Sequence, residues 1–170
     1  RVQLVTHKKN RGLPAALNTG LEAADANFIA RQDADDRSYS QRLECQHRYL
    51  CNNPNVAVLS TGVDVADEND TIINSFAPPE DPTTEFDTAN PIIHGSVMAR
   101  KESLLGVNGY DEFFIKCQDY DLWSRLSAAG HKIRAIPEIL YRMRRKSKSL
   151  TVEERKTYAT YAALARLPEY

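Results

Sequence analysis

The chain has 170 residues, of which 42% are hydrophobic and 26% charged, enough for one domain with a sizeable core. Its 22 basic and 23 acidic residues give a formal net charge of −1, so no overall field favours nucleic acid or an anionic membrane. No apolar run is long enough to span a bilayer, and the three cysteines lack the spacing of a zinc or redox site. We therefore expect a globular α/β or α+β domain in the cytoplasm, with reduced thiols.

The first third of the chain alternates expected strands and helices. Short β-branched or apolar runs predict strands, and apolar residues spaced by three or four predict helices. The expected elements are a strand at 2–6, a helix on the stripe of Leu13, Leu17 and Leu21, a strand at 27–31, a helix from 39 to about 50 and a strand at 56–59. This alternation is typical of an open α/β sheet, in which ligands bind at the carboxyl ends of strands.

The rest of the chain is less regular. Glycine, proline and Asp/Asn clusters mark its turns. We expect two extended pieces within 62–76, a loop at 77–82, a strand at 96–100, a turn at 106–109, a helix at 119–129 ended by a left-handed Gly130, extended segments at 131–136 and 139–143 around Pro137, and a helix from the capping box of Thr151 and Glu154 toward Leu167.

Three carboxylates, Asp33, Asp35 and Asp36, follow the expected strand at 27–31. Like charges at this density repel one another, so they need either open water or a cation. A solvated acidic loop is the plain alternative. Carboxylate oxygens suit Mg²⁺ or Mn²⁺, ions that complete their shell with water and substrate phosphates, so a nucleotide diphosphate would be a natural partner.

Three further stretches admit both a structural and a functional interpretation. Gln118 to Trp123 opens a helix, where an Asp can simply cap the amino end and Trp123 can belong to the core. Residues 142–148 hold five basic side chains, which favour either a solvated loop or a clamp for phosphate. In the stretch from Asn90 to Ser96, a lone histidine is more often structural than catalytic, but Gly95 would let the backbone approach a ligand.

Taken in order, four blocks of residues resemble the catalytic domain of glycosyltransferase family 2. The blocks are NRG with ALNTG at 10–20, ARQDADD at 30–36, GYDEF with QDYDLW at 109–123, and Tyr141-Arg142 with Ser147 and Ser149. The resemblance covers about residues 1–150. It implies the GT-A fold, a Rossmann-like α/β mixed sheet flanked by helices, with 151–170 as a C-terminal helix.

The resemblance implies an inverting transfer of a sugar from a nucleotide diphosphate to an acceptor hydroxyl. Asp35 would hold the divalent cation, Mg²⁺ or Mn²⁺, with Asp33 near the ribose or beside the metal and Asp36 assisting. Asp119 would be the general base that takes the acceptor proton. The basic run near Arg142 and Arg144 would fold over the diphosphate and exclude water. The side chains expected to face the donor sugar or the acceptor are His94, Gly95, Ser96, Gln118 and Trp123.

Several positions depart from the family pattern. Gln118 stands where the family has Glu, Arg144 replaces a His that could bind metal, and Ser40 replaces a Pro. The family domain also opens with a strand-helix-strand unit that holds the nucleotide base, and residue 1 corresponds to its third strand. We therefore expect a longer parent chain, and expect residues 1–170 alone to bind sugar nucleotide weakly or not at all.

The expected partners are a sugar nucleotide, with a UDP-sugar favoured, and a saccharide or lipid-linked saccharide acceptor, as in polysaccharide biosynthesis. Peripheral contact with the inner face of a membrane stays open. Two other functions also stay open: a non-catalytic sugar-nucleotide or carbohydrate-binding module on the same fold, and phosphoryl transfer with Asp33 as nucleophile and Asp35 as acid.

Overall fold

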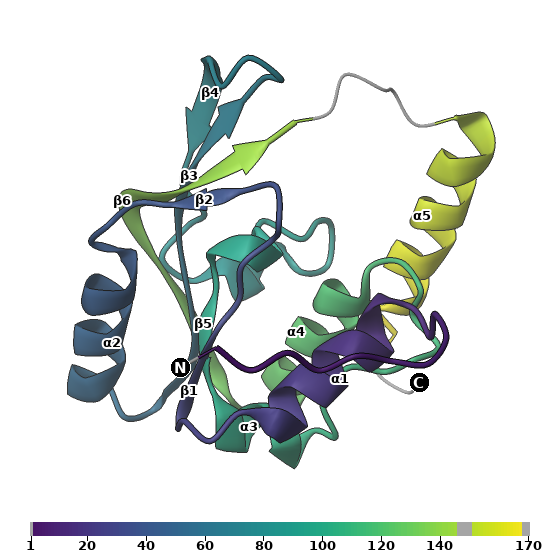
Figure 1. Ribbon diagram of the computed structural model, residues 1–170, viewed down its shortest axis with the longest axis horizontal. Coiled ribbons are helices and arrows are strands. Elements are labelled where there is room, and N and C mark those ends of the chain that lie inside the picture. The colour runs from purple at the N-terminus through teal and green to yellow at the C-terminus, as the bar shows by residue number, and fades with distance from the viewer. Residues whose placement is uncertain (1, 146–150, 168–170) are drawn as a thin grey trace.

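The computed structural model describes residues 2–145 and 151–167 and contains one mixed sheet (Figure 1). The order along the sheet is β1-β5-β3-β6-β2, and β4 pairs with the far half of β3. Among the strands of the described residues, β3 and β6 pair in parallel and the other pairs are antiparallel. The strands are β1 Phe28–Ala30, β2 Arg37–Ser38, β3 Val56–Ala66, β4 Ile72–Phe76, β5 Met98–Arg100 and β6 Lys132–Arg144.

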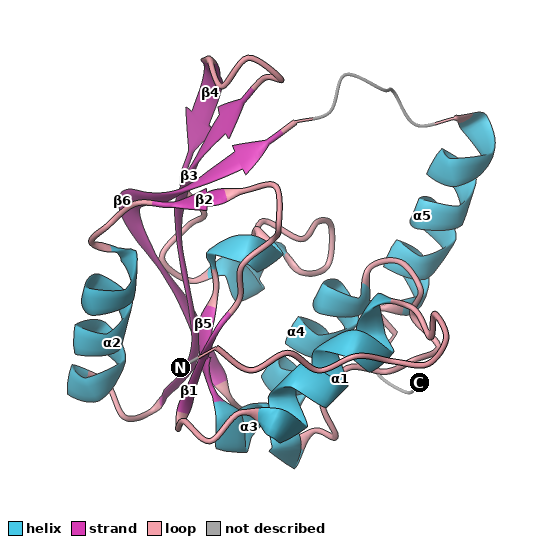
Figure 2. Ribbon diagram, viewed as in Figure 1, coloured by secondary structure: helices cyan, strands magenta, loops and turns pink. Residues whose placement is uncertain are grey.

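Helices cover both faces of this sheet (Figure 2). One face carries α2, and the other carries α1, α3, α4 and α5. The helices are α1 Leu13–Ala23, α2 Arg42–Asn52, α3 Lys101–Gly106, α4 Gln118–Ala128 and α5 Val152–Leu164, with the short 3-10 turns η1 Pro82–Glu85 and η2 His94–Ser96. This arrangement confirms the expected α/β fold with a mixed sheet flanked by helices.

Two hydrophobic clusters lie on the two faces of the sheet. The smaller one joins Leu50 of α2 to Val56, Leu59 and Met98. The larger one is built around Trp123 of α4 and also contains residues of α1, α3, β3 and α5. Burying each large apolar side chain contributes roughly 1.5–3 kcal/mol. Every residue of β3 is buried, because this strand has helices on both faces and strands on both sides.

The helix at the C-terminal end packs on the domain. Thr151 and Glu154 form the predicted capping box, in which the Thr151 hydroxyl accepts from the Glu154 N–H at 3.2 Å. Ala162 and Ala165 join the larger cluster, and the ring of Tyr161 lies 5.9 Å from that of Phe114. α5 ends at Leu164, before the predicted Leu167.

One strand prediction was wrong, and the two extended segments predicted around Pro137 were confirmed as parts of one strand. Residues 2–6, although described, are not in a strand, because no strand of the described chain pairs with them; Val2 is 97% and Leu4 is 84% exposed. The predicted extended segments at 131–136 and 139–143 both belong to β6, which continues past Pro137 through an irregularity in its pairing. The register passes from Thr61 opposite Ile136 to Gly62 opposite Ile139, so Pro137 lies outside the regular pairing.

None of the helices in the described part of the chain is both long and apolar enough to cross a membrane.

The irregularity in β6 depends on a glycine in β3. A Cβ added at Gly62 would lie 2.7 Å from the carbonyl oxygen of Pro137, so Gly62→Ala should lower the free energy of unfolding by about 1–3 kcal/mol. Gly20→Ala in α1, where nothing lies within 4 Å, should raise it by about 0.5–1 kcal/mol. Urea denaturation of the complete protein measures both. Equal effects of the two substitutions would contradict the close approach of β3 and β6.

Candidate functional site

The acidic loop, residues 31–36, runs from β1 to β2 and is tied to β6. The Tyr141 hydroxyl donates to Asp36 Oδ2 at 2.8 Å and accepts from the Asp33 N–H at 3.2 Å. Asp36 Oδ1 accepts from the Arg144 N–H at 2.8 Å. Asp36 is therefore held by protein groups on both of its oxygens, whereas Asp35 is exposed.

The three carboxylates of this loop act on one another. Burial raises the pKa of Asp36, and the negative charges of Asp33 and Asp35 raise it further, whereas the hydrogen bonds from Arg144 and Tyr141 lower it. The predicted concentration of negative charge is therefore present. Asp33 is partly neutralised, because its Oδ1 accepts from Arg31 Nη2 at 2.6 Å in an ion pair.

Asp119 lies in the first turn of α4, a helix that begins directly after a residue with an unusual backbone conformation. Cys117, the residue before the helix, has a left-handed φ of 57°. In the first turn of α4, Asp119 Oδ2 accepts from Asn90 Nδ2 at 3.0 Å. Burial raises the pKa of Asp119, and this outweighs the hydrogen bonds from backbone N–H groups and from Asn90 and the positive charge of Arg31, all of which lower it. A carboxylate with a raised pKa is a better proton acceptor at neutral pH.

Arg31 is a cation at the start of the acidic loop. Its guanidinium forms the ion pair with Asp33, and its charge also acts on Asp119 and on His94. The Arg31 side chain is 15% exposed, so this cation beside the acidic loop is mostly buried. Arg31 was not predicted as a site residue, although an arginine two residues before an acidic cluster is a signal that the sequence contains.

His94 also belongs to this cluster, as a neutral group. Its Nε2 lies 2.7 Å from the Tyr110 hydroxyl, and its ring contacts the edge of Trp123 at a centroid distance of 5.9 Å. Burial lowers the pKa of His94 to about 3, helped by the charge of Arg31. At neutral pH this ring can accept or donate a hydrogen bond but carries no charge.

The other predicted sugar-facing residues occupy different surroundings. Gly95 packs against Tyr141, so closely that a Cβ would lie 2.1 Å from the Tyr141 hydroxyl. Ser96 is fully buried and donates to the Ile93 carbonyl at 2.8 Å, and Trp123 is 1% exposed. Gln118 is half-buried at the start of α4, next to Asp119. The structure thus places Ser96 and Trp123 in the core and Gln118 beside the cluster.

The basic residues of β6 divide between two places. The side chain of Arg142 donates to the Tyr39 hydroxyl at 3.0 Å and to Asp70 Oδ2 at 3.3 Å, so these contacts are with the residue after β2 and with the β3–β4 turn rather than with the acidic loop. Arg144 contacts the loop through its backbone, and its buried Nε has no partner among the described residues. Lys146, Ser147, Lys148 and Ser149 lie outside the described residues.

The metal-ligating capacity of the site is small. No group of three or more His, Cys, Asp or Glu side chains in the described chain is arranged to hold a metal ion. An ion such as Mg²⁺ or Mn²⁺ commonly binds through one or two carboxylates and takes water and phosphate for the rest of its shell. The exposed Asp35, with Asp33 in the same loop, fits that mode of binding.

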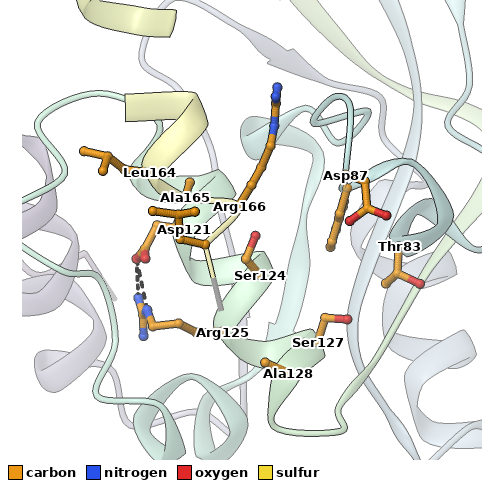
Figure 3. A pocket seen from close by; sticks show the side chains of 12 residues that line it. Thr83, Asp87, Asp121, Ser124, Arg125, Ser127, Ala128, Leu164, Ala165 and Arg166 are labelled. Carbon is orange, nitrogen blue, oxygen red and sulfur yellow. Dashed lines mark hydrogen bonds and ion pairs between the residues drawn. The ribbon is translucent and has the colours of Figure 1, made fainter. Parts of the chain in front are cut away.

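A hollow of about 300 Å³ lies apart from this cluster, between η1, α4 and the end of α5 (Figure 3). The Asp121–Arg125 ion pair, at 2.6 Å, forms one side of it, and Arg166 extends from the end of α5 and donates to the Thr88 carbonyl at 2.9 Å. Its lining contains neither Asp119 nor a residue of the acidic loop: it consists of Thr83, Phe86, Asp87, Asp121, Ser124, Arg125, Ser127, Ala128, Leu164, Ala165, Arg166 and Leu167.

The raised pKa of Asp119 makes the stability of the protein depend on pH. Between the ordinary pKa and the raised one, the folded state binds more protons than the unfolded state, so the free energy of unfolding falls as pH rises through that window. Asparagine does not titrate. The stability of Asp119→Asn relative to wild type should therefore increase from about pH 4 to pH 7. Chemical denaturation across this range measures it, and a constant difference would contradict the burial of a charged Asp119.

Comparisons with known proteins agree with the motifs and the fold. The model of glycosyl transferase family 2 matches residues 1–105. An uncharacterized glycosyltransferase of Methanocaldococcus jannaschii is 32% identical over 95% of this chain, and the putative glycosyltransferase EpsE of Bacillus subtilis is 31% identical over 98%. An Escherichia coli relative, 31% identical over 82% of this chain, is named UDP-Gal:alpha-D-GlcNAc-diphosphoundecaprenol beta-1,3-galactosyltransferase.

The chain spans 58%, 63% and 51% of the length of these three relatives. Among solved structures, residues 1–349 of Staphylococcus aureus TarS in complex with UDP align with a TM-score of 0.64 over 94% of this chain and 46% of TarS. Because their sequence identity is only 15%, this likeness concerns the fold alone, which is the GT-A fold. Since the family model matches more than half of the residues, the chain belongs to glycosyl transferase family 2.

Proposed function

We propose that the protein transfers a sugar from a nucleotide diphosphate to an acceptor hydroxyl, with inversion and with a divalent cation. One observation carries the proposal: the segment from Asn90 to Gly95 reaches both Asp119 and the residue that holds the acidic loop. Asn90 donates to Asp119 Oδ2 at 3.0 Å, and Gly95 packs on Tyr141, whose hydroxyl holds the acidic loop. A donor diphosphate held at the loop would therefore lie near a carboxylate able to act on the acceptor. Membership of a family of glycosyltransferases supports the reaction class.

In this proposal Asp35, with Asp33, holds Mg²⁺ or Mn²⁺ beside the donor diphosphate. The ion would neutralise the charge that develops as the diphosphate leaves. Asp36 keeps the loop in place, since both of its oxygens are already held by β6. Arg144, whose Nε has no partner in the described chain, is better placed than Arg142 to meet phosphate, because Arg142 is engaged by Asp70 and Tyr39.

Asp119 would take the proton from the acceptor hydroxyl while that oxygen attacks the anomeric carbon in line. One displacement inverts the configuration at that carbon. Burial raises the pKa of Asp119 toward the working pH, and the amide of Asn90 fixes one of its oxygens. The neutral His94, held by Tyr110, would offer a hydrogen-bonding group without adding charge near the sugar.

The donor and acceptor classes rest on the relatives. The E. coli relative is named for a UDP-galactose donor and a lipid diphosphate acceptor, and the TarS structure contains UDP. We propose a UDP-sugar donor and a saccharide or lipid-linked saccharide acceptor, used in polysaccharide biosynthesis on the cytoplasmic side of a membrane.

A non-catalytic module that binds sugar nucleotide is the second candidate, and two substitutions favour it. Gln118 stands in place of the acid next to Asp119, and Arg144 stands in place of a histidine that could bind metal. Such a module would bind the donor with the same loop and would show no dependence on Asp119.

Two substitutions in the complete protein separate these candidates. Asp119→Asn should lower transfer by about 10²–10⁴-fold, because the base is lost, and should leave UDP binding nearly unchanged. Asp35→Asn should remove the Mn²⁺-dependent part of UDP affinity. Radiolabelled transfer and calorimetry measure the two effects, and Asp87→Asn, an exposed carboxylate outside the cluster, is the control. Unchanged turnover in Asp119→Asn would remove Asp119 from the mechanism.

A further inference from the structure

Arg42 is a buried cation without an acidic partner. It lies in the first turn of α2, is 2% exposed and forms no ion pair within the described chain. Burying a charge in this way is expensive unless the group is well hydrogen-bonded, and burial here lowers the pKa of Arg42. A neutral side chain would fill the same space at less cost. The arginine therefore needs a reason of its own.

Its three contacts supply that reason, because each reaches a different segment of the proposed site. Nη2 donates to the Arg31 carbonyl at 2.7 Å, where the acidic loop begins. Nη1 donates to the Gly95 carbonyl at 2.5 Å, next to His94. The guanidinium also lies over the ring of Tyr141, 5.2 Å from its centroid, and the hydroxyl of that ring holds Asp33 and Asp36.

Only arginine combines these contacts. Its planar fork presents two donors to two carbonyls while its face stacks on an aromatic ring. Lysine carries the same charge as a single compact group and cannot span both carbonyls with the same geometry. The distance between Gly95 and the Tyr141 ring is also fixed, since the two are so close that no side chain at position 95 would fit between them.

We propose that Arg42 is a positioning residue for donor binding: from behind the site, it sets the acidic loop, the turn at Gly95 and Tyr141 in one fixed arrangement. The role in donor binding rests on the proposed function. Arg42 itself touches neither donor nor acceptor in this scheme, and it acts through the backbone of residues 31 and 95. A loop displaced by about 1 Å would lose much of its affinity for a metal-bound diphosphate.

The chain offers a matched control one turn further along α2. Gln46 is fully buried and also donates to two backbone carbonyls, those of Leu59 at 2.9 Å and Ser96 at 2.8 Å. It has no contact with the acidic loop or with Tyr141 among the interactions of the described chain. Replacing either residue by methionine removes two buried hydrogen bonds from α2, but only one replacement releases the loop.

The experiment compares Arg42→Met, Arg42→Lys and Gln46→Met in the complete protein. Hydrogen–deuterium exchange of residues 31–36 without ligand reports the position of the loop, and calorimetry with UDP and Mn²⁺ reports binding. We expect Arg42→Met to speed exchange in this loop and to weaken UDP binding by at least tenfold, with Arg42→Lys between it and wild type. Gln46→Met should lower the melting temperature and leave both readouts at wild-type values.

The outcomes are distinguishable. Unchanged loop exchange and UDP affinity in Arg42→Met, or equal changes in Gln46→Met, would overturn the positioning role. If Arg42→Met does not fold, Arg42→Lys is judged by the same two readouts. If wild-type protein binds no UDP while Arg42→Met still loosens the loop, the proposed function fails and the structural role of Arg42 in placing the loop stands.

Discussion

The candidate site depends on one buried hydroxyl group. Tyr141 projects from β6, is fully buried, and joins the side chain of Asp36 to the backbone of Asp33. The same ring packs on Gly95 and under Arg42. Segments more than 100 residues apart in the sequence therefore meet at a single side chain. β6 is fixed by its long parallel pairing with β3. The acidic loop is therefore attached, through Tyr141, to a strand at the centre of the sheet.

The electrostatics of the cluster follow from this packing. Holding three carboxylates in one loop is unfavourable, and the raised pKa of Asp36 reflects both its burial and its acidic neighbours. Arg31 offsets part of the repulsion and carries positive charge toward Asp119. A divalent cation and a diphosphate could complete the balance, since the ion would face the loop and the phosphates would face Arg31 and Arg144. In such a site, the alternation of negative loop, cation, diphosphate and arginine would orient a charged donor.

Sequence patterns predicted much of this arrangement, and the failures have physical causes. The positions of Asp33 and Asp35 after a strand and of Asp119 at the start of a helix could be predicted from the sequence, and the roles of these residues stay predictions. Arg42 was missed because the spacing of apolar residues in a helix does not show that a charged residue is buried. Its partners are also backbone carbonyls of segments distant in the sequence. Arg142 was expected at the diphosphate, but its side chain contacts Tyr39 and Asp70, on the side of the strand away from Tyr141. The strand expected at 2–6 was wrong because alternation alone supplies no pairing partner.

The central claim is that a metal-bound diphosphate at the acidic loop and the carboxylate of Asp119 serve one reaction centre. A crystal structure of the complete protein soaked with UDP and Mn²⁺ tests it most directly, through the anomalous signal of manganese. The account predicts a manganese peak coordinated by Asp35 and by the diphosphate, with the Asp119 carboxylate opening into the same cavity. A UDP molecule bound elsewhere, or a manganese ion separated from Asp119 by packed protein, would contradict it.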